Sequence, residues 1–153
     1  MKIQYPTYPD LRDRTVLITG GGSGIGAAFV EAFVLQGSRV AFLDIQNEVS
    51  QELIQSLSGK GPEPIYVDCD VTDISALKDA IQQVEEELGA VRVLINNAAS
   101  DERHNPEEVT PEYWENRLKV NPTITFLRHR QSNPRWQRLG EARSSIWVPS
   151  VGI

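Results

Sequence analysis

Near its N-terminus the chain reads Thr15-Val16-Leu17-Ile18-Thr19-Gly20-Gly21-Gly22-Ser23-Gly24-Ile25-Gly26. A short apolar run leads directly into a glycine-rich turn, and a helical pattern follows. We expect Gly20 to make the tight turn, Gly24 to let a phosphate approach the backbone, and Gly26 to let the helix pack closely. The phosphate would also lie at a helix N-terminus, where unpaired N–H groups favour an anion. The pattern therefore predicts a phosphate-binding turn between a buried strand and a helix.

An acidic residue follows the next predicted strand. Residues 39–43 read Arg-Val-Ala-Phe-Leu, and Asp44 comes directly after them, 24 positions beyond Gly20. This spacing is close to that of a carboxylate which binds the adenosine ribose of a dinucleotide. A solvated aspartate at a strand end is the alternative. The order strand, turn, helix, strand favours the ribose-binding role.

Apolar strands alternate with amphipathic helices along the chain, which indicates an α/β fold. Strands are predicted at 15–19, 39–44, 65–67 and 91–96. Helices are predicted at 24–36, 47–57 and 75–88, and a last helix at 110–120 has Thr110 as its cap and Pro111 at its first position. Residues 1–14 are expected to form an irregular arm. Helical spacing in the first helix predicts a buried face made of Ile25, Ala28, Phe29, Ala32 and Phe33.

Two further segments complete a set of four motifs. Asp68-Cys69-Asp70-Val71 follows the third strand, and Asn96-Asn97-Ala98-Ala99 ends the fourth. In order and spacing, the four motifs resemble those of the short-chain dehydrogenase/reductase family: TGxxxGIG, an acid after the second strand, a D-V pair after the third and NNAG after the fourth. Ala99 replaces the last glycine. The resemblance implies a partial Rossmann-type doubly wound parallel sheet, with strand order 3-2-1-4 and a possible fifth strand.

The resemblance also implies a function and a cofactor site. The function is NAD-dependent oxidation of an alcohol or sugar by hydride transfer, and segments such as 42–45, 96–104 and 109–115 resemble sugar dehydrogenases of the xylose dehydrogenase type. The implied contacts are Gly20, Gly22, Ser23, Gly24, Ile25 and Gly26 with the pyrophosphate, Asp44 and Ile45 with the adenosine ribose, Asp70 and Val71 with adenine, and Asn97 and Ala98 with the second ribose. Asn96 would tie the fourth strand to its neighbour. Residues 101–104 would meet sugar hydroxyls or form an ordinary polar loop.

The family's catalytic residues are only partly matched. Asn121 follows Val120 as the family's proton-relay asparagine does, and Ser150 lies where the catalytic serine would follow a fifth strand. The alternatives are a helix-ending asparagine and a chance similarity. The family's tyrosine base, with a lysine four residues later, has no match, because none of the four tyrosines is followed by lysine at that spacing. A tyrosine with a pKa near 10 is a poor base at pH 7, so we expect this chain alone to be inactive.

The character of the sequence changes after Asn121. Pro122 interrupts the predicted helix, and the balance of charge reverses. Residues 1–121 hold 10 basic and 20 acidic residues, whereas residues 122–153 hold 5 basic and 1 acidic. We expect 1–121 to be the NAD-binding Rossmann portion and 122–153 to be a degenerate or frame-shifted tail that ends in the possible fifth strand. A native basic tail for an acidic partner is the alternative.

Composition limits the function classes that remain. The chain has 153 residues, a formal net charge of −6 and a single cysteine. These features argue against a nucleic-acid partner and a disulfide framework, and no metal-ligand spacing is present. With no predicted membrane span or signal peptide, we expect a cytoplasmic protein. The resemblance to the short-chain dehydrogenase/reductase family implies that the parent enzyme acts on a small-molecule alcohol or sugar and is a homo-oligomer. The alternatives are a non-catalytic dinucleotide-binding remnant and a regulatory nucleotide-binding module.

Overall fold

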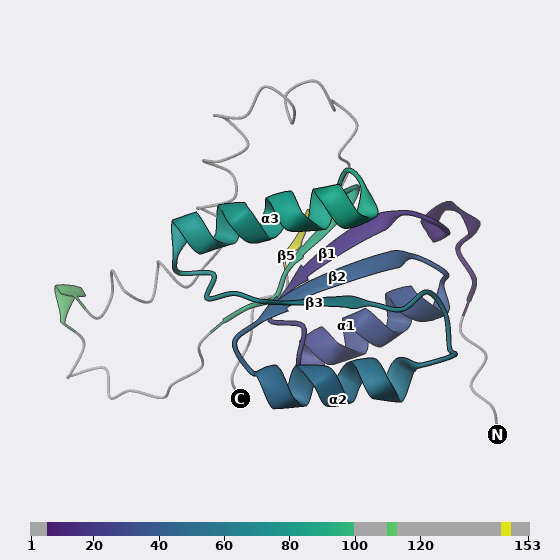
Figure 1. Ribbon diagram of the computed structural model, residues 1–153, viewed down its shortest axis with the longest axis horizontal. Helices are drawn as coiled ribbons and strands as arrows, with labels where there is room; N and C mark the ends of the chain where they lie inside the picture. The colour runs from purple at the N-terminus through teal and green to yellow at the C-terminus, as the bar shows by residue number, and fades with distance from the viewer. Residues whose placement is uncertain (1–5, 100–109, 113–144, 148–153) are drawn as a thin grey trace.

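The computed structural model describes residues 6–99, 110–112 and 145–147. Its strands form one parallel sheet in the order β3-β2-β1-β4-β5 (Figure 1). The elements in chain order are a 3₁₀ turn at Pro9–Leu11, β1 (Thr15–Thr19), α1 (Gly24–Leu35), β2 (Arg39–Asp44), α2 (Asn47–Leu57), β3 (Ile65–Asp68), α3 (Ile74–Leu88), β4 (Val93–Asn96) and β5 (Ser145–Trp147). The predicted fold class and the strand order 3-2-1-4 are confirmed, and β5 pairs in parallel with β4 at the edge where a fifth strand was expected.

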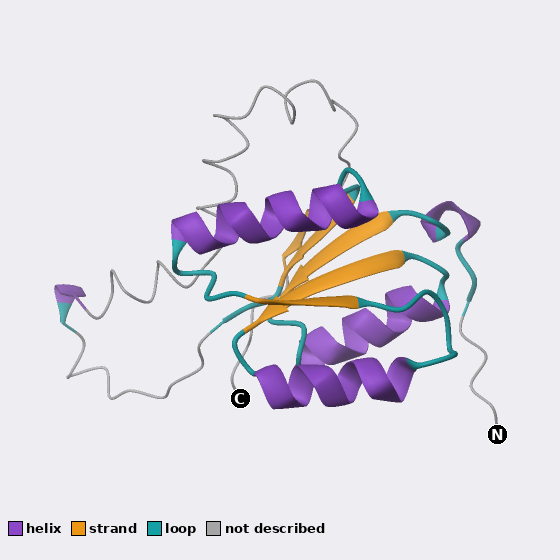
Figure 2. Cartoon of the chain, viewed as in Figure 1, coloured by secondary structure: helices purple, strands orange, loops and turns teal. Residues whose placement is uncertain are grey.

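Helices cover both faces of the sheet. α1 and α2 lie on one face and α3 on the other (Figure 2). Residues of β1 alternate between the two cores, so that Leu17 packs toward α3 while Val16 and Ile18 pack toward α1 and α2. All five residues of β1 are buried, as expected of a central parallel strand with helices on both sides.

The ends of the elements follow from local contacts. α2 begins and ends where the sequence predicts. α3 begins at Ile74, because the carboxylate of Asp73 accepts hydrogen bonds from the backbone N–H groups of Ser75 (2.8 Å) and Ala76 (3.1 Å). β4 is shorter than predicted and starts at Val93, although Val91 is also buried.

The predicted buried face of α1 is partly wrong. Ile25 is 56% exposed, and Ala28 and Ala32 are also exposed. The fully covered positions are Gly26, Val30 and Val34, and the predicted residues Phe29 and Phe33 are only partly buried beside them. Apart from Glu31, α1 has no charged or polar side chain, so periodicity alone could not select the face that meets the sheet.

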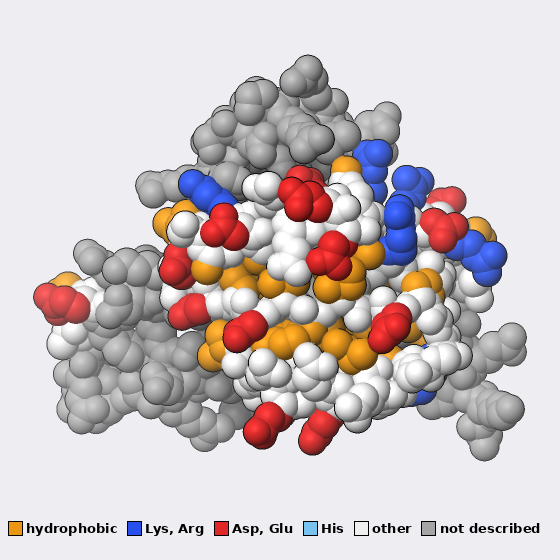
Figure 3. Space-filling view, viewed as in Figure 1, with side chains coloured by type: hydrophobic (Ala, Val, Ile, Leu, Met, Phe, Trp, Pro, Cys, Tyr) orange, Lys and Arg blue, Asp and Glu red, His pale blue; other side chains and the backbone are white. Residues whose placement is uncertain are grey.

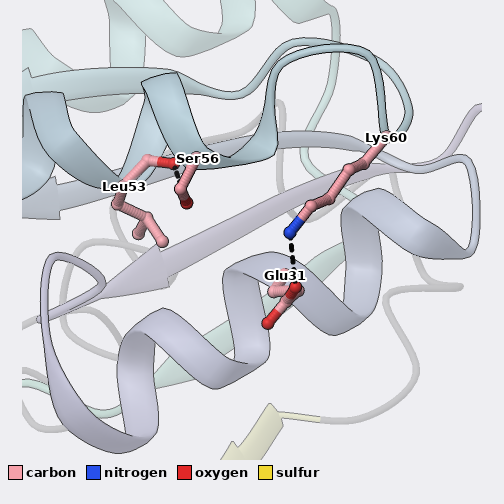
Figure 4. A network of polar contacts seen from close by, with 4 residues as sticks. All are labelled: Glu31, Leu53, Ser56 and Lys60. Atoms are coloured by element: carbon pink, nitrogen blue, oxygen red, sulfur yellow. Dashed lines mark hydrogen bonds and ion pairs between the residues drawn. The ribbon is translucent and has the colours of Figure 1, made fainter. Parts of the chain in front are cut away.

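An ion pair joins α1 to the turn after α2, where Lys60 Nζ lies 3.0 Å from Glu31 Oε1 (Figure 4). A separate hydrogen bond lies within α2, where the Ser56 hydroxyl donates to the Leu53 carbonyl oxygen. Both partners of the ion pair are nearly half exposed, so the pair contributes at most about 1 kcal/mol. Packing of apolar side chains therefore dominates the contact between these two helices.

Acidic side chains are scattered over the visible face of the molecule, and several Lys and Arg side chains gather at its upper right (Figure 3). Figure 3 shows Asp and Glu side chains spread over α2 and α3, with hydrophobic side chains in bands between these helices and the edge of the sheet. Among the residues that the structure describes, no helix has the length and hydrophobicity to cross a membrane.

Part of the sequence-based interpretation lies outside the described residues. The predicted helix at 110–120 is described only at its start, where Pro111 and Glu112 are helical. Asn121, Ser150 and the loop 101–104 belong to the segments that are not described.

Candidate functional site

A cleft of about 560 Å³ opens at the carboxyl ends of β1, β2, β3 and β4. Ligands of open α/β sheets bind at this edge, where the strand order reverses. The lining residues are Gly20, Ser23, Gly24, Ile25, Leu43, Asp44, Ile45, Gln46, Cys69, Asp70, Val71, Thr72, Asn97, Ala98 and Ala99. The structure therefore brings together, around one cleft, ten of the twelve residues that the sequence predicts for a cofactor site.

The remaining two predicted residues, Gly22 and Gly26, form the wall behind the cleft. A Cβ atom on Gly26 would overlap the carbonyl oxygen of Gly20, so only glycine lets α1 begin this close to the turn. Gly20 has a φ of 64°, and a Cβ there would lie 2.7 Å from the Cα of Ala98. The turn is thus built by backbone atoms in close contact, as a turn that presents N–H groups to a ligand requires.

Asp44 ends β2 with its carboxylate held in place. The side chain is only 7% exposed. Its Oδ2 accepts a hydrogen bond from the backbone N–H of Gly22 (2.8 Å), and its Oδ1 accepts one from the backbone N–H of Gln46 (3.0 Å). A carboxylate has about four acceptor positions, so two remain for donors in the cleft. Asp44 can therefore accept the hydrogens of a ligand hydroxyl without rearrangement.

The end of β4 is tied to β1 by Thr19 and Asn97. The Thr19 hydroxyl oxygen accepts hydrogen bonds from the backbone N–H groups of Asn97 and Ala98, both at 3.1 Å. The side-chain amide of Asn97 donates to the Gly20 carbonyl oxygen at 2.8 Å. For Asn96, the expected tie, the buried Oδ1 has no hydrogen-bond partner in the described part of the chain. The side chain of Asn97 therefore joins the end of β4 to the turn that follows β1.

The segment after β3 forms the far wall of the cleft. Val71 and Cys69 are buried there, whereas Asp70 is exposed. Hydrogen bonds from the hydroxyl and the backbone N–H of Thr72 lower the pKa of Asp70, so its carboxylate stays charged at neutral pH. Burial, with the nearby charges of Asp70, Asp73 and Asp68, raises the pKa of the Cys69 thiol to about 11. This wall offers a charged acceptor at the surface and a neutral thiol beneath it.

Sequence reasoning missed Gln46 in the cleft wall and Thr19 behind it. The side-chain amide of Gln46 donates to the Ser23 hydroxyl oxygen at 3.2 Å, which joins the end of β2 to the glycine turn. A glutamine two residues after a strand belongs to no motif, so only its place in the folded chain reveals it. Thr19 could have been found, because a threonine that ends a buried strand needs a partner for its hydroxyl. Within the described residues, no three His, Cys, Asp or Glu side chains are grouped to hold a metal ion.

The sequence model of short chain dehydrogenases matches residues 14–145, which is most of the chain. The chain belongs to the short-chain dehydrogenase family. The matched range includes the glycine turn, Asp44 and the 96–99 segment, and members of this family bind a nicotinamide dinucleotide. The family match continues past Asn121, the boundary that we predict between a regular portion and an altered tail.

Curated relatives include two sugar dehydrogenases. The Rhizobium meliloti protein named "Probable galactose dehydrogenase GalD" is 45% identical over 141 residues, which cover 92% of this chain and 55% of the relative. D-xylose 1-dehydrogenase of Caulobacter vibrioides is 45% identical over 122 residues, which cover 80% of this chain and 46% of the relative. The predicted similarity to sugar dehydrogenases is confirmed. The chain spans about half the length of these relatives.

A solved structure shows the same arrangement. A blue fluorescent protein from a metagenomic library, in complex with NADPH, superimposes with a TM-score of 0.71 at 29% identity. The match covers 80% of this chain and 52% of that structure. The short-chain dehydrogenase fold of this chain is therefore shared with a protein that holds a nicotinamide dinucleotide.

Proposed function

We propose that the cleft binds NAD, and that this chain corresponds to the cofactor-binding half of a dehydrogenase which oxidises a sugar or a related alcohol. The observation that carries the proposal is the buried carboxylate of Asp44 at the cleft. Two backbone N–H groups fix it, and about two of its acceptor positions remain for a ligand. NAD, when bound, accepts a hydride from the alcohol carbon. The residues of this chain bind and orient the cofactor.

The glycine turn fits a pyrophosphate. Its backbone is uncovered at Gly24, where a Cβ atom would meet no other atom within 4 Å. The turn leads into the N-terminus of α1, whose first N–H groups and dipole favour an anion. The predicted contacts of Gly20, Ser23, Gly24 and Ile25 with the pyrophosphate rest on this geometry and on their shared place in the cleft.

Asp44 favours NAD over NADP. The 2′-phosphate of NADP carries a charge of about −1.5 to −2 and would approach the carboxylate that we assign to the adenosine ribose. Two unit charges 4 Å apart at an effective dielectric of 20 repel by about 4 kcal/mol, before screening and relaxation. A preference of about tenfold to a hundredfold follows. The similar solved structure holds NADPH, so the preference of this chain is tested by titrating it with NAD⁺ and with NADP⁺.

The identity to galactose and D-xylose dehydrogenases supports a sugar as the substrate of the whole enzyme. The proposed catalytic residues of this chain are Asn121 in the proton relay and Ser150 beside the substrate oxygen. A tyrosine–lysine pair at the family's spacing is lacking among the tyrosines of these 153 residues. General acid–base groups contribute about 10²–10⁴-fold to rate, so we expect no measurable turnover by this polypeptide.

The experiment is titration calorimetry of the purified chain with NAD⁺, accompanied by an assay for NADH formation with xylose, galactose and simple alcohols. We expect binding without turnover. Saturable binding of NAD⁺ that is weakened at least about tenfold by Asp44→Ala would support the assignment. Absence of NAD⁺ binding at millimolar concentration would contradict the cofactor site, and turnover that copurifies with the chain would contradict its inactivity.

A further inference from the structure

We propose that Gln46 is a positioning residue of the dinucleotide site: it holds the Ser23 hydroxyl so that Ser23 donates its proton to an oxygen of the bound ribose or phosphate. The inference rests on the proposed binding of NAD. It adds a residue that belongs to none of the motifs and that acts through Ser23.

The place of Gln46 is set by the carboxylate of Asp44. The backbone N–H of Gln46 donates to Asp44 Oδ1 at 3.0 Å, directly before α2 begins. From this anchored position the side chain reaches Ser23, which directly precedes α1, and its Nε2 donates to the serine oxygen at 3.2 Å. The contact therefore links the start of both helices across the side of the cleft that Asp44 occupies.

The direction of this hydrogen bond decides what Ser23 can do. A serine hydroxyl has one proton to donate and two acceptor positions. Because the Gln46 amide donates to the oxygen, one acceptor position is used and the proton stays available. A serine directly before a helix often caps it by accepting a hydrogen bond from a backbone N–H of the first turn. The Ser23 side chain makes no such bond to α1. Both residues are exposed at the cleft wall, so the proton can reach a ligand oxygen.

The arrangement gives the ribose–phosphate end of the ligand two complementary partners. Asp44 can only accept hydrogen bonds, and the Ser23 hydroxyl, which lines the same cleft, supplies a donor. A ribose oxygen or a phosphate oxygen can accept from Ser23, whereas a ribose hydroxyl can donate to Asp44. Gln46 contacts both, through its backbone to Asp44 and through its side chain to Ser23.

The test is a double-mutant cycle read by titration calorimetry with NAD⁺ and, separately, with ADP-ribose. The variants are Gln46→Met, which keeps the length of the side chain without its donor, Ser23→Ala and the double substitution. Ser23→Thr retains a hydroxyl, and Gln82→Met removes an exposed glutamine of α3 that bonds to Glu86 away from the cleft. We expect Gln46→Met to weaken binding of both ligands by about threefold to tenfold, with no further loss in the Ser23→Ala background.

The controls separate positioning from stability. We expect Gln82→Met to bind both ligands as the unmodified chain does, and Ser23→Thr, which keeps the hydroxyl, to bind them more tightly than Ser23→Ala. All single variants should keep the thermal midpoint of the unmodified chain. The role of Gln46 would be contradicted if Gln46→Met weakened binding equally in the Ser23→Ala background, or if it did not weaken binding at all. Either result would leave the proposed cofactor site intact. If the unmodified chain binds neither NAD⁺ nor ADP-ribose, the proposed function fails together with this inference.

Discussion

Two aspartates lie on the same cleft at the ends of neighbouring strands, and they are held in different ways. We call residues 20–26 with 44–46 the Asp44 corner, and residues 68–73 the Asp70 corner. At the Asp44 corner, the carboxylate is buried and accepts N–H groups from two separate segments of the backbone. At the Asp70 corner, the carboxylate is exposed and, within the residues that the structure describes, accepts hydrogen bonds only from Thr72, two residues away.

The cleft therefore combines a rigid wall at the Asp44 corner with an adaptable wall at the Asp70 corner. Burying a carboxylate is costly unless its oxygens are hydrogen-bonded, so the contacts of Asp44 fix its position before a ligand arrives. An exposed aspartate in a local turn exchanges partners with water at little cost. We therefore expect ligand discrimination to depend on the Asp44 corner, and the Asp70 corner to contribute surface and modest affinity.

The largest expected effect is at Gly26. A Cβ atom in Gly26→Ala would overlap the Gly20 carbonyl oxygen and lie 2.7 Å from the Asn97 side chain, so the turn must move. We expect a loss of about 3 kcal/mol or more in the free energy of unfolding, measured by urea denaturation. Gly59→Ala is the control, because its φ of 76° costs only about 1–2 kcal/mol and its Cβ would meet open space. Equal losses in the two variants would show that the Asp44 corner is not tightly packed.

The next largest expected effect is the difference in folding stability between Asp44→Ala and Asp70→Ala. Asp44→Ala leaves the N–H groups of Gly22 and Gln46 without their acceptor in a buried place, and we expect it to destabilise the fold by about 2–4 kcal/mol. Asp70→Ala removes contacts that water can replace, so its expected cost stays below about 1 kcal/mol. Thermal and urea unfolding of both variants measure the difference. A cost at Asp70 as large as that at Asp44 would remove the distinction between the corners.

The fold and most of the cleft could be predicted from the sequence, because the features that determine them are local. The glycine turn, Asp44 and the 96–99 segment each end a strand, and parallel strands bring their carboxyl ends to one edge. α2 has apolar residues at helical spacing among polar ones, and its predicted ends agree with the structure. α1 has a single charged residue, Glu31, among apolar ones, so its contact face depends on tertiary packing. The prediction that Ile25, Ala28 and Ala32 are buried was wrong.

The contacts that were missed join segments far apart in the chain. Gln46 meets Ser23 across 23 residues, and Thr19 meets Asn97 across 78. Neither pair has a spacing that a helix or strand period would produce. Their partners become known only once the strand order and the close approach at Gly20 and Gly26 are known.

The smallest expected effect is the dependence of folding stability on alkaline pH that arises from the thiol of Cys69, a residue of the Asp70 corner. Its thiol pKa is raised from 9.0 to about 11 by burial and by the surrounding aspartates. In the unfolded chain the thiol ionises first, so the stabilising contribution is complete below pH 9 and declines as the pH rises through about 11. We expect alkylation by iodoacetamide at pH 8 to be far slower in the folded chain than in urea, and Cys69→Ala to reduce the alkaline loss of stability. Rapid alkylation of the folded chain would contradict a buried, neutral thiol.

The most direct test of the account is the ratio of dissociation constants for NADP⁺ and NAD⁺, measured by calorimetry on the unmodified chain and on Asp44→Asn. Asparagine keeps the size of the side chain and removes its charge. If the fixed carboxylate of Asp44 selects the cofactor, the unmodified chain binds NAD⁺ about tenfold to a hundredfold more tightly, and Asp44→Asn brings the ratio close to one. Asp70→Asn leaves the ratio unchanged. Equal affinities in the unmodified chain, or tighter binding of NADP⁺, would contradict the assignment of Asp44 as the residue that binds the adenosine ribose.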